Sequence, residues 1–389
     1  MLSNLRKNVK AARRELSLRR LPTIAPFPPA QLRKPVSHAA AFQLANAGDV
    51  LLPLTLKDVI HTDCGELNWN NLHVHNEVSD RTVRSINESA GLIIGGGGLF
   101  LRDTNPNQLS GWQWSCSLEH LRQIEVPIAA FAVGYNRFRG QPDFEPIFTE
   151  HVNELAKRSV YLGLRNQGSI NAMRAYLTPE NQEKLRFQPC MTTVLSRIYP
   201  RLCDYENKED FIALNAAFDR PELRFGSDPP SKLRELANAI RRLGENRKLK
   251  YYAHMERDEQ MCPYLDAAGV EYELVRLDRY SPERIVAEYA KPSLVIGMRG
   301  HAQMIPFGTE TPILSLITHD KLRFFIDDIG HPEWGVDMGD DGFAEDLVAL
   351  SEEILDSRTE TQAMIRESAE VLWDTCRTNV RDFLHAIEA

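Results

Sequence analysis

Short apolar runs alternate with amphipathic segments twice along this chain, once before and once after a charged stretch at residues 205–210. In the first half, strands are expected at 39–44, 72–78, 91–94, 128–133 and 160–164, and helices at 51–61, 80–89, 118–124, 144–158 and 170–176. Such alternation is typical of βα units built around a mostly parallel sheet. The first half therefore predicts one doubly wound α/β domain.

The same alternation restarts in the second half. Strands are expected at 211–215, 248–253, 271–277, 294–296 and 313–316, and helices at 230–243, 256–267, 282–289, 302–307 and 321–329, before a long helical stretch at 345–389. A chain of 389 residues exceeds what one hydrophobic core usually organises.

We therefore predict an α/β fold with two doubly wound, Rossmann-like domains that face each other across a cleft. The expected parts are a leader and linker at 1–36, an N-terminal domain at 37–205 and a C-terminal domain at 206–389. Open parallel sheets bind ligands beyond the carboxyl ends of their strands, so the cleft is the expected site.

Charge is distributed unevenly along the chain. Residues 1–36 carry nine Lys or Arg and one Glu, a local charge of +8, so the remaining residues sum to −16 within a total of −8. An acidic body argues against nucleic acid as a partner, because neutralising phosphates needs a basic face on the folded part. Residues 2–21 indicate a basic amphipathic helix, which fits either peripheral contact with an anionic membrane or packing against protein.

No apolar stretch reaches the ~18 to 20 residues needed to span a bilayer, and the basic leader lacks the apolar centre of a signal peptide. The six cysteines are widely spaced without a CxxC pair, which fits reduced thiols better than a zinc site or a disulfide framework. We therefore expect a cytoplasmic protein, at most peripheral to the inner face of the membrane. The sequence leaves a homo-oligomer open.

Candidate site residues follow two expected strands of the N-terminal domain. Four consecutive glycines come directly after the strand expected at 91–94: Gly95, Gly96, Gly97 and Gly98. They form either a tight turn or a backbone cradle for an anion. Asn46 and Asp49 precede the helix expected at 51–61, so Asp49 either caps that helix or points with Asn46 into the cleft.

The C-terminal domain offers a sharper pattern, because Arg299 and His301 lie between a strand end and a helix start. The arginine fork matches a carboxylate or phosphate, the helix start adds its dipole, and histidine titrates near neutral pH. This combination predicts a site for a small anion that also needs a proton. Lys321, at the start of a later helix, either adds a second cation to this pocket or stays solvated.

Arg165 stands at another strand end, from which it can approach the cleft as part of a cationic clamp on a doubly charged ligand. Ser169 is the expected N-cap of the helix at 170–176 and a candidate for ligand contact. His73 and His75 have no third ligand at a fixed spacing, so no metal site is predicted. Cys190 is expected to be a buried structural thiol rather than a nucleophile.

Together these residues resemble the motifs of the polysaccharide pyruvyl transferase family. The resemblance covers about residues 40–330 and rests on the order of Asn46 to Asp49, Gly95 to Gly98, Arg165 with Ser169, the segment Gly297-x-Arg299-x-His301, and Lys321. One departure is that family members commonly carry an aspartate near the end of the first domain, where this chain has QPCMTT at 188–193.

The resemblance implies a GT-B-like fold, no cofactor or metal, phosphoenolpyruvate as the donor and a glycan or glycan precursor as the acceptor. Arg165, Arg299 and Lys321 would bind the trianionic donor. His301 would act as the general acid on its methylene carbon, and Asp49 would orient or deprotonate a sugar hydroxyl, giving a pyruvate ketal. The rival hypothesis is a GT-B glycosyltransferase with a nucleotide-sugar donor, which needs a carboxylate for the ribose.

Overall fold

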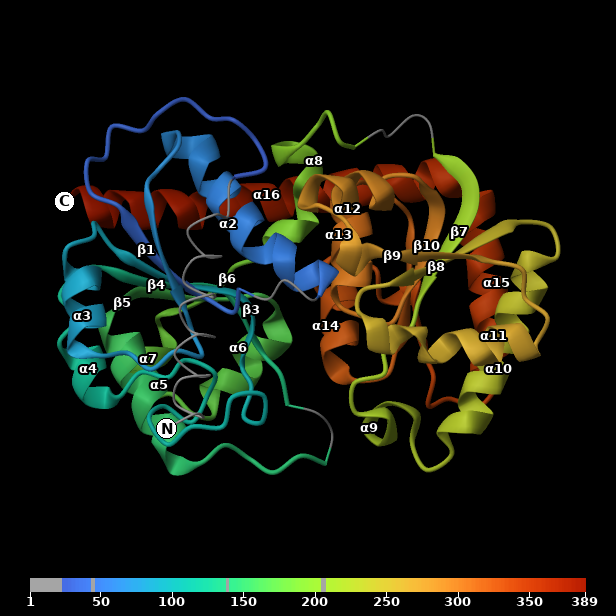
Figure 1. The fold of residues 1–389 in the computed structure, drawn as a ribbon, viewed down its shortest axis with the longest axis horizontal. Helices are drawn as coiled ribbons and strands as arrows, with labels where there is room; N and C mark the ends of the chain where they lie inside the picture. Colours follow the sequence, from blue (N-terminus) through green and yellow to red (C-terminus); the bar gives the residue numbers. More distant parts are fainter. Residues whose placement is uncertain (1–22, 43–45, 138–139, 204–207) are drawn as a thin grey trace, which may run out of the picture.

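The chain forms two parallel β-sheets of six strands each in a computed structural model that describes residues 23–42, 46–137, 140–203 and 208–389. The two sheets lie side by side with helices around them (Figure 1). The predicted fold of two doubly wound α/β domains is confirmed. The expected leader helix at 2–21 lies outside the described residues.

The first sheet has the strand order β2-β1-β3-β4-β5-β6. Its strands are β1 (Val36–Ala40), β2 (Trp69–His73), β3 (Leu92–Phe100), β4 (Ile128–Tyr135), β5 (Ser159–Leu164) and β6 (Leu185–Phe187). The helices of this half are α2 (Ala47–Cys64), α3 (Asp80–Asn87), α4 (Leu118–Arg122), α5 (Pro146–Arg158), α6 (Gln167–Arg174), α7 (Pro179–Gln182), the 3₁₀ turn η1 (Met191–Thr193) and α8 (Leu195–Ile198). The strand order reverses between β1 and β3, which is where doubly wound sheets bind ligands.

The second sheet has the order β12-β11-β10-β7-β8-β9, the arrangement of a Rossmann fold, and reverses between β7 and β10. Its strands are β7 (Glu209–Asn215), β8 (Lys248–Ala253), β9 (Glu273–Arg276), β10 (Pro292–Gly297), β11 (Ile313–Ile317) and β12 (Gly335–Asp337). The helices are α9 (Pro221–Phe225), α10 (Pro229–Gly244), α11 (Cys262–Ala267), α12 (Pro282–Tyr289), α13 (His301–Gly308), α14 (Asp320–Asp328), α15 (Phe343–Asp356) and α16 (Arg358–Glu388), with 3₁₀ turns η2 (Glu256–Met261), η3 (Leu277–Arg279) and η4 (Pro332–Trp334).

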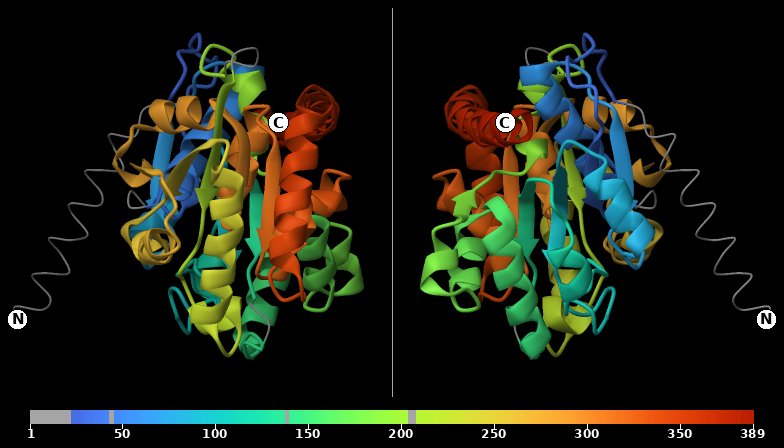
Figure 2. Two further views of the ribbon diagram at one scale, coloured as in Figure 1. Left: turned by 90° about the vertical axis from the view of Figure 1, so that its right-hand side faces the viewer. Right: turned by 90° about the vertical axis from the view of Figure 1, so that its left-hand side faces the viewer.

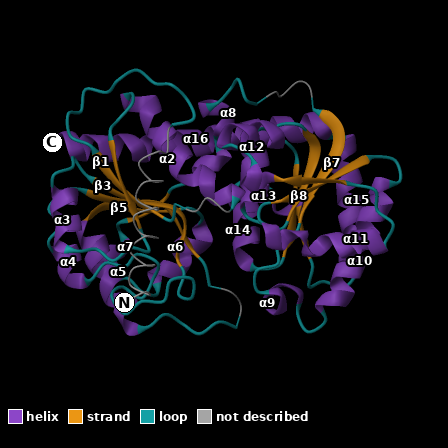
Figure 3. Ribbon diagram, viewed as in Figure 1, coloured by secondary structure: helices purple, strands orange, loops and turns teal. Residues whose placement is uncertain are grey.

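Burial of the central strands explains their sequence. Helices cover both faces of each sheet (Figure 3), so every residue of β1, β10 and β11 is buried and the strands are rich in aliphatic residues. Many helices begin at side chains that accept a backbone N–H of the first turn. These N-caps include Ser79, Ser117, Asn166, Thr178 and Ser281.

Several local predictions need correction. The strands expected at 39–44 and 72–78 lie earlier, at Val36–Ala40 and Trp69–His73, and the helix expected at 256–267 is the 3₁₀ turn η2 followed by α11. The short edge strands β6 and β12 were not expected, because three residues carry too little periodicity to identify a strand. Strand β3 continues through the glycines to Phe100 instead of ending at Ile94. The expected helical stretch at 345–389 is two helices, α15 and α16, that meet at Ser357.

The terminal helix α16 joins the two halves. It packs on α2 and β5 of the first half and on α13 and α15 of the second. Figure 1 shows it running behind both sheets, and it lies on the outside of the molecule in the side views of Figure 2. A single hydrophobic core includes α2, both sheets and α16, so the two domains share buried surface. Within the described residues, no helix is both long and apolar enough to cross a membrane.

Candidate active site

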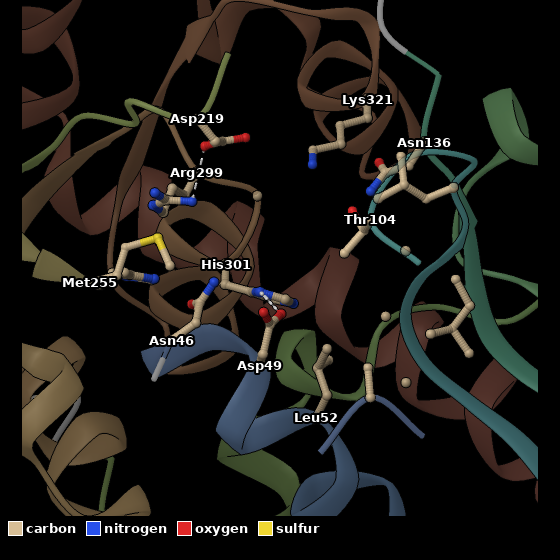
Figure 4. Close-up of a pocket in the computed structure, with 18 of the residues that line it drawn as sticks. Asn46, Asp49, Leu52, Thr104, Asn136, Asp219, Met255, Arg299, His301 and Lys321 are labelled. Atoms are coloured by element: carbon tan, nitrogen blue, oxygen red, sulfur yellow. Dashed lines mark ion pairs between the residues drawn. The ribbon is translucent and has the colours of Figure 1, made fainter. Parts of the chain in front are cut away.

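A cavity of about 510 Å³ opens between the domains at the carboxyl ends of both sheets, beside both points where the strand order reverses. Nine of the predicted site residues line it: Asn46, Asp49, Gly96, Gly97, Gly98, Arg165, Arg299, His301 and Lys321. They come from segments that are far apart in sequence and line one space. Figure 4 labels five of them, Asn46, Asp49, Arg299, His301 and Lys321. Two predicted residues, Gly95 and Ser169, do not line this cavity.

The start of α2 differs from the prediction. The helix begins at Ala47, and its N-cap is Asn46, whose Oδ1 accepts the Gly48 N–H at 3.0 Å. The expectation that Asp49 caps the helix is therefore wrong. Asp49 lies in the first turn, and its carboxylate faces His301, with 3.9 Å between Asp49 Oδ1 and His301 Nδ1. Figure 4 shows the two side chains side by side.

Gly48 explains how the imidazole reaches this position. A Cβ on Gly48 would lie 2.3 Å from His301 Nδ1, closer than any real contact allows, so only glycine lets the ring lie against α2. Gly48 was not selected from the sequence, because nothing in the local pattern shows which side chain of the other domain approaches it.

The surroundings of His301 favour the neutral form of its ring. Its side chain is 12 % exposed, and burial, followed by the charges of Arg165, Lys321 and Arg299, lowers its pKa to about 3. Its Nε2 is buried and has no hydrogen-bond partner among the described residues. A buried ring nitrogen without a partner is costly to maintain, which favours a ligand-directed role for this atom.

Arg299 is less available to a ligand than the sequence suggested. Its Nε donates to Asp258 Oδ2 at 2.8 Å, its Nη2 donates to Asp258 Oδ1, and its Nη1 lies 3.3 Å from Asp219 Oδ1. Burial opposes the charge of Arg299, but the bonds to Asp258 outweigh it and raise the arginine pKa. Arg299 therefore supplies a fixed positive charge, but most of its guanidinium N–H groups already contact the two aspartates. The sequence did not identify Asp258 or Asp219 as site residues, because both stand in polar segments that are typical of the protein surface.

Among the three predicted cations of the site, Arg165 and Lys321 have donors to spare. Arg165 is 8 % exposed, its Nη2 donates to Asn136 Oδ1 at 3.2 Å, and its Nε is buried with no partner among the described residues. Within the same residues, no hydrogen bond or ion pair engages the Lys321 ammonium. Burial, and then the charge of Arg165, lowers the pKa of Lys321 to about 7. The two side chains, one from each domain, form an open cationic pair.

Gly134 makes room for this arginine. A Cβ on Gly134 would lie 2.3 Å from Arg165 Nε, so a larger residue there would push the guanidinium out of place. Gly134 belongs to β4, and it was not selected from the sequence.

The glycine run serves two purposes. Gly96 and Gly97 have φ angles of 79° and 124°, which side-chain-bearing residues rarely adopt, and their backbone lines the cavity. A Cβ on Gly98 would meet Asn136 Nδ2 at 2.2 Å. Gly95 instead allows close packing inside the sheet, since its Cβ would lie 2.0 Å from the Phe131 carbonyl oxygen. Its assignment to the ligand site is corrected accordingly.

Ser169 is also a structural residue. It is fully buried, and its Oγ accepts the Tyr135 N–H at 3.0 Å, which fixes the end of β4. The N-cap of α6 is Asn166, whose Oδ1 accepts the Ser169 N–H at 2.7 Å. The helix begins at Gln167, earlier than expected, so Ser169 falls inside its first turn.

The segment at 188–193, where the family usually has an aspartate, lies in the core. Gln188 donates to the Pro189 carbonyl and to Cys376 of α16, and η1 packs on α2, α13 and α16. Burial raises the pKa of Cys190, which fits the expected buried thiol. Among the described residues, no three His, Cys, Asp or Glu side chains gather as a metal site would require.

Two Rossmann-like domains with a cavity between the carboxyl ends of their sheets define the GT-B fold, and solved structures support this class. UDP-GlcNAc 2-epimerase from Neisseria meningitidis, bound to UDP-GlcNAc, matches with a TM-score of 0.54 and 8 % identity over 90 % of this chain and 99 % of that one. Anabaena Alr3699/HepE, in complex with UDP and glucose, matches with a TM-score of 0.52 and 10 % identity over 91 % and 100 %. Sucrose-phosphate synthase from Thermosynechococcus elongatus matches with a TM-score of 0.52 and 11 % identity over 88 % and 95 %. At such low identities these likenesses establish the fold alone.

The sequence identifies the family. The model of the polysaccharide pyruvyl transferase family matches residues 39–320, and the chain belongs to that family. No curated protein matches the sequence.

Proposed function

We propose that this protein transfers an enolpyruvyl unit from phosphoenolpyruvate to sugar hydroxyls and closes a pyruvate ketal on a polysaccharide or glycan precursor. The observation that carries the proposal is the open cationic pair Arg165 and Lys321 beside the unpartnered Nε2 of His301. A compact trianion needs several cations, and protonating its methylene carbon needs an acid within reach. Family membership supports the same reaction.

The donor is bound first by the pair of cations. The Arg165 guanidinium and the Lys321 ammonium both line the cavity and make no ion pair among the described residues, so carboxylate and phosphate oxygens can bridge the two domains. Arg299 lies farther along the wall and adds a fixed charge held by Asp258 and Asp219. The start of α13, at His301, adds its helix dipole.

Chemistry follows from the position of His301. An imidazolium there donates its proton to the donor's methylene carbon, which becomes a methyl group, and positive charge develops on the adjacent carbon. A sugar hydroxyl attacks that carbon and loses its proton. The carbon–oxygen bond to phosphate then breaks, and a second sugar hydroxyl adds and loses its proton to close the ketal.

We assign two roles to Asp49: it stabilises the His301 imidazolium, and it acts as the base that accepts the proton of the sugar hydroxyl. It stands 3.9 Å from His301 Nδ1, where a carboxylate stabilises the imidazolium before proton transfer. Burial raises the pKa of Asp49, although Arg299, Lys321 and Arg165 oppose that shift. A carboxylate with a raised pKa accepts a proton from an attacking hydroxyl more readily than an ordinary one. The small donor leaves much of the cavity for the acceptor.

A GT-B glycosyltransferase with a nucleotide-sugar donor is the alternative, since solved structures with similar folds hold UDP. A thermal-shift comparison separates the two functions. A ligand at 100 times its dissociation constant stabilises the folded state by about 2.7 kcal/mol. Stabilisation by phosphoenolpyruvate but not by UDP-sugars supports pyruvyl transfer, and the reverse pattern supports the alternative.

The direct test is turnover of phosphoenolpyruvate, followed as released phosphate in the presence of candidate sugar acceptors. We expect His301→Ala to lose nearly all activity while still binding the donor, because Arg165 and Lys321 remain. Unchanged turnover in this variant would remove His301 from the mechanism. The proposed reaction routes no step through a metal ion, so addition of a chelator should leave the rate unchanged.

A further inference from the structure

The pair Arg165 and Lys321 poses a physical problem when no donor is bound. The two cations come from different domains, and the charge of Arg165 is the largest electrostatic influence on Lys321. Like charges repel, and the repulsion is strong where water is excluded. Something other than the ligand has to hold the starts of α6 and α14 together.

A contact between those two helices lies close to Arg165, at the end of α14 away from Lys321. The Gln167 N–H, the first of α6, donates to both carboxylate oxygens of Asp328, at 3.2 Å to Oδ1 and 3.1 Å to Oδ2. Gln167 is two residues from Arg165. Asp328 ends α14 and is seven residues from Lys321, which is about 10 Å along a helix. A carboxylate at the N-terminus of a helix is favoured by both the free N–H and the dipole.

Close packing accompanies this bond. A Cβ on Gly168 would lie 2.2 Å from Cδ2 of Phe324, so the backbone of α6 rests on the aromatic ring of α14. Helices α6 and α14 lie side by side in the middle of the molecule (Figure 1). The contact therefore fixes both the distance and the angle between α14, which carries Lys321, and α6, which begins two residues after Arg165.

We propose that the contact of Asp328 and Phe324 with the start of α6 is an interdomain strut that holds Arg165 and Lys321 within reach of one anion. Asp328 is then a positioning residue, outside the cavity, that sets the affinity of the clamp for its anionic ligand. The proposal rests on the proposed function only for the identity of that ligand, since the strut would position the two cations for any phosphate-bearing donor.

Removing Asp328 tests the proposal because two explanations predict opposite signs. Burial raises the pKa of Asp328 to about 7, against the Gln167 hydrogen bond that lowers it, so the carboxyl is partly ionised at neutral pH. Through-space electrostatics alone predicts that losing this negative charge strengthens anion binding. The strut predicts that Asp328→Ala weakens binding of inorganic phosphate, measured by isothermal titration calorimetry, by about tenfold, or about 1.4 kcal/mol. The matched control is Asp327→Asn, which removes an exposed neighbouring charge on the same helix and should leave the phosphate affinity within about twofold of the wild type.

Gln167→Pro removes the donor instead of the acceptor. Proline is tolerated at the first position of a helix, and Asn166 already has the extended conformation that a following proline requires, with φ −156° and ψ 158°. This variant keeps the charge of Asp328 and should weaken phosphate binding to a similar degree. For phosphoenolpyruvate, both variants should raise KM about tenfold with kcat within about twofold.

The outcomes separate this proposal from the proposed function. Weaker phosphate binding in both variants without any pyruvyl transfer would support the strut and refute the function. Pyruvyl transfer with phosphate affinities equal to those of the Asp327→Asn control would refute the strut. A lower unfolding temperature with unchanged phosphate affinity would also refute it, because Asp328 would then contribute stability and no positioning.

Discussion

Replacing Lys321 with arginine should remove the part of the alkaline fall in kcat/KM for phosphoenolpyruvate that the lysine causes, whereas the need for a protonated His301 is common to both enzymes. Burial, and then the Arg165 charge, lowers the pKa of Lys321 to about 7. A lysine is cationic only below its pKa, so the clamp has its full charge in acid and loses it as the pH rises through about 7. Arginine at this position stays charged throughout the range.

The size of the effect follows from that pKa. A group with a pKa of about 7 is roughly 90 % protonated at pH 6 and roughly 10 % protonated at pH 8. If only the cationic form of Lys321 binds the donor, kcat/KM of the wild type relative to Lys321→Arg should fall about tenfold for each pH unit above about 8. Because kcat/KM reports the free enzyme, the profile senses Lys321 before the donor restores its charge.

The assay is the initial rate of phosphate release at low phosphoenolpyruvate, measured from about pH 6 to about pH 9 for the wild type and Lys321→Arg. Ionisation of the donor affects both enzymes equally, so their ratio isolates the lysine. Lys157→Arg, an exposed lysine on α5, is the matched control and should follow the wild type. Superimposable profiles for the wild type and Lys321→Arg would refute the reasoning.

Three further predictions concern the imidazole and the arginine. With its pKa lowered to about 3, His301 is neutral before the donor binds, so donor binding should place a proton on the ring. Calorimetry in buffers of different ionisation enthalpy at about pH 6, where Lys321 is already mostly cationic, should therefore show a larger proton uptake in the wild type than in His301→Gln; equal uptake would contradict a protonated acid. Gly48→Ala should displace the imidazole of His301, because the new Cβ would lie 2.3 Å from Nδ1. In steady-state kinetics we expect kcat to fall about 100-fold while KM for the donor stays nearly unchanged. An undiminished kcat would show that the position of the ring is not critical. Asp258→Ala leaves the buried charge of Arg299 without its main partner and should lower the free energy of unfolding, measured with denaturant, by about 3 to 5 kcal/mol. The control Glu256→Ala, at an exposed position nearby, should leave the free energy of unfolding almost unchanged.

Local sequence patterns determined the architecture. Apolar runs of strand length alternate with amphipathic segments, and that alternation depends only on residues close together in the chain. Residues that follow parallel strands also gather at one edge of a sheet, which is why the sequence alone could place Arg165, Arg299, His301 and Lys321 together.

Helix starts were predicted less well, because several residues near each start can serve as the cap. Asp49 and Ser169 are both plausible caps by type, yet Asn46 and Asn166 cap α2 and α6. The actual caps lie three residues before the expected ones, so Ser169 falls inside the first turn of α6, where it is buried. Only the hydrogen bonds of the folded backbone decide between neighbouring candidates.

Tertiary structure alone decided which side chains are partners. Asp258 occupies the fork of Arg299, Gly48 receives the ring of His301, and Asp328 meets the first N–H of α6. Each pair joins segments that are tens to hundreds of residues apart, and the last two cross from one domain to the other. Periodicity records which face of an element is buried but not what lies against it, so such contacts emerge only when the two sheets and α16 are packed into one body.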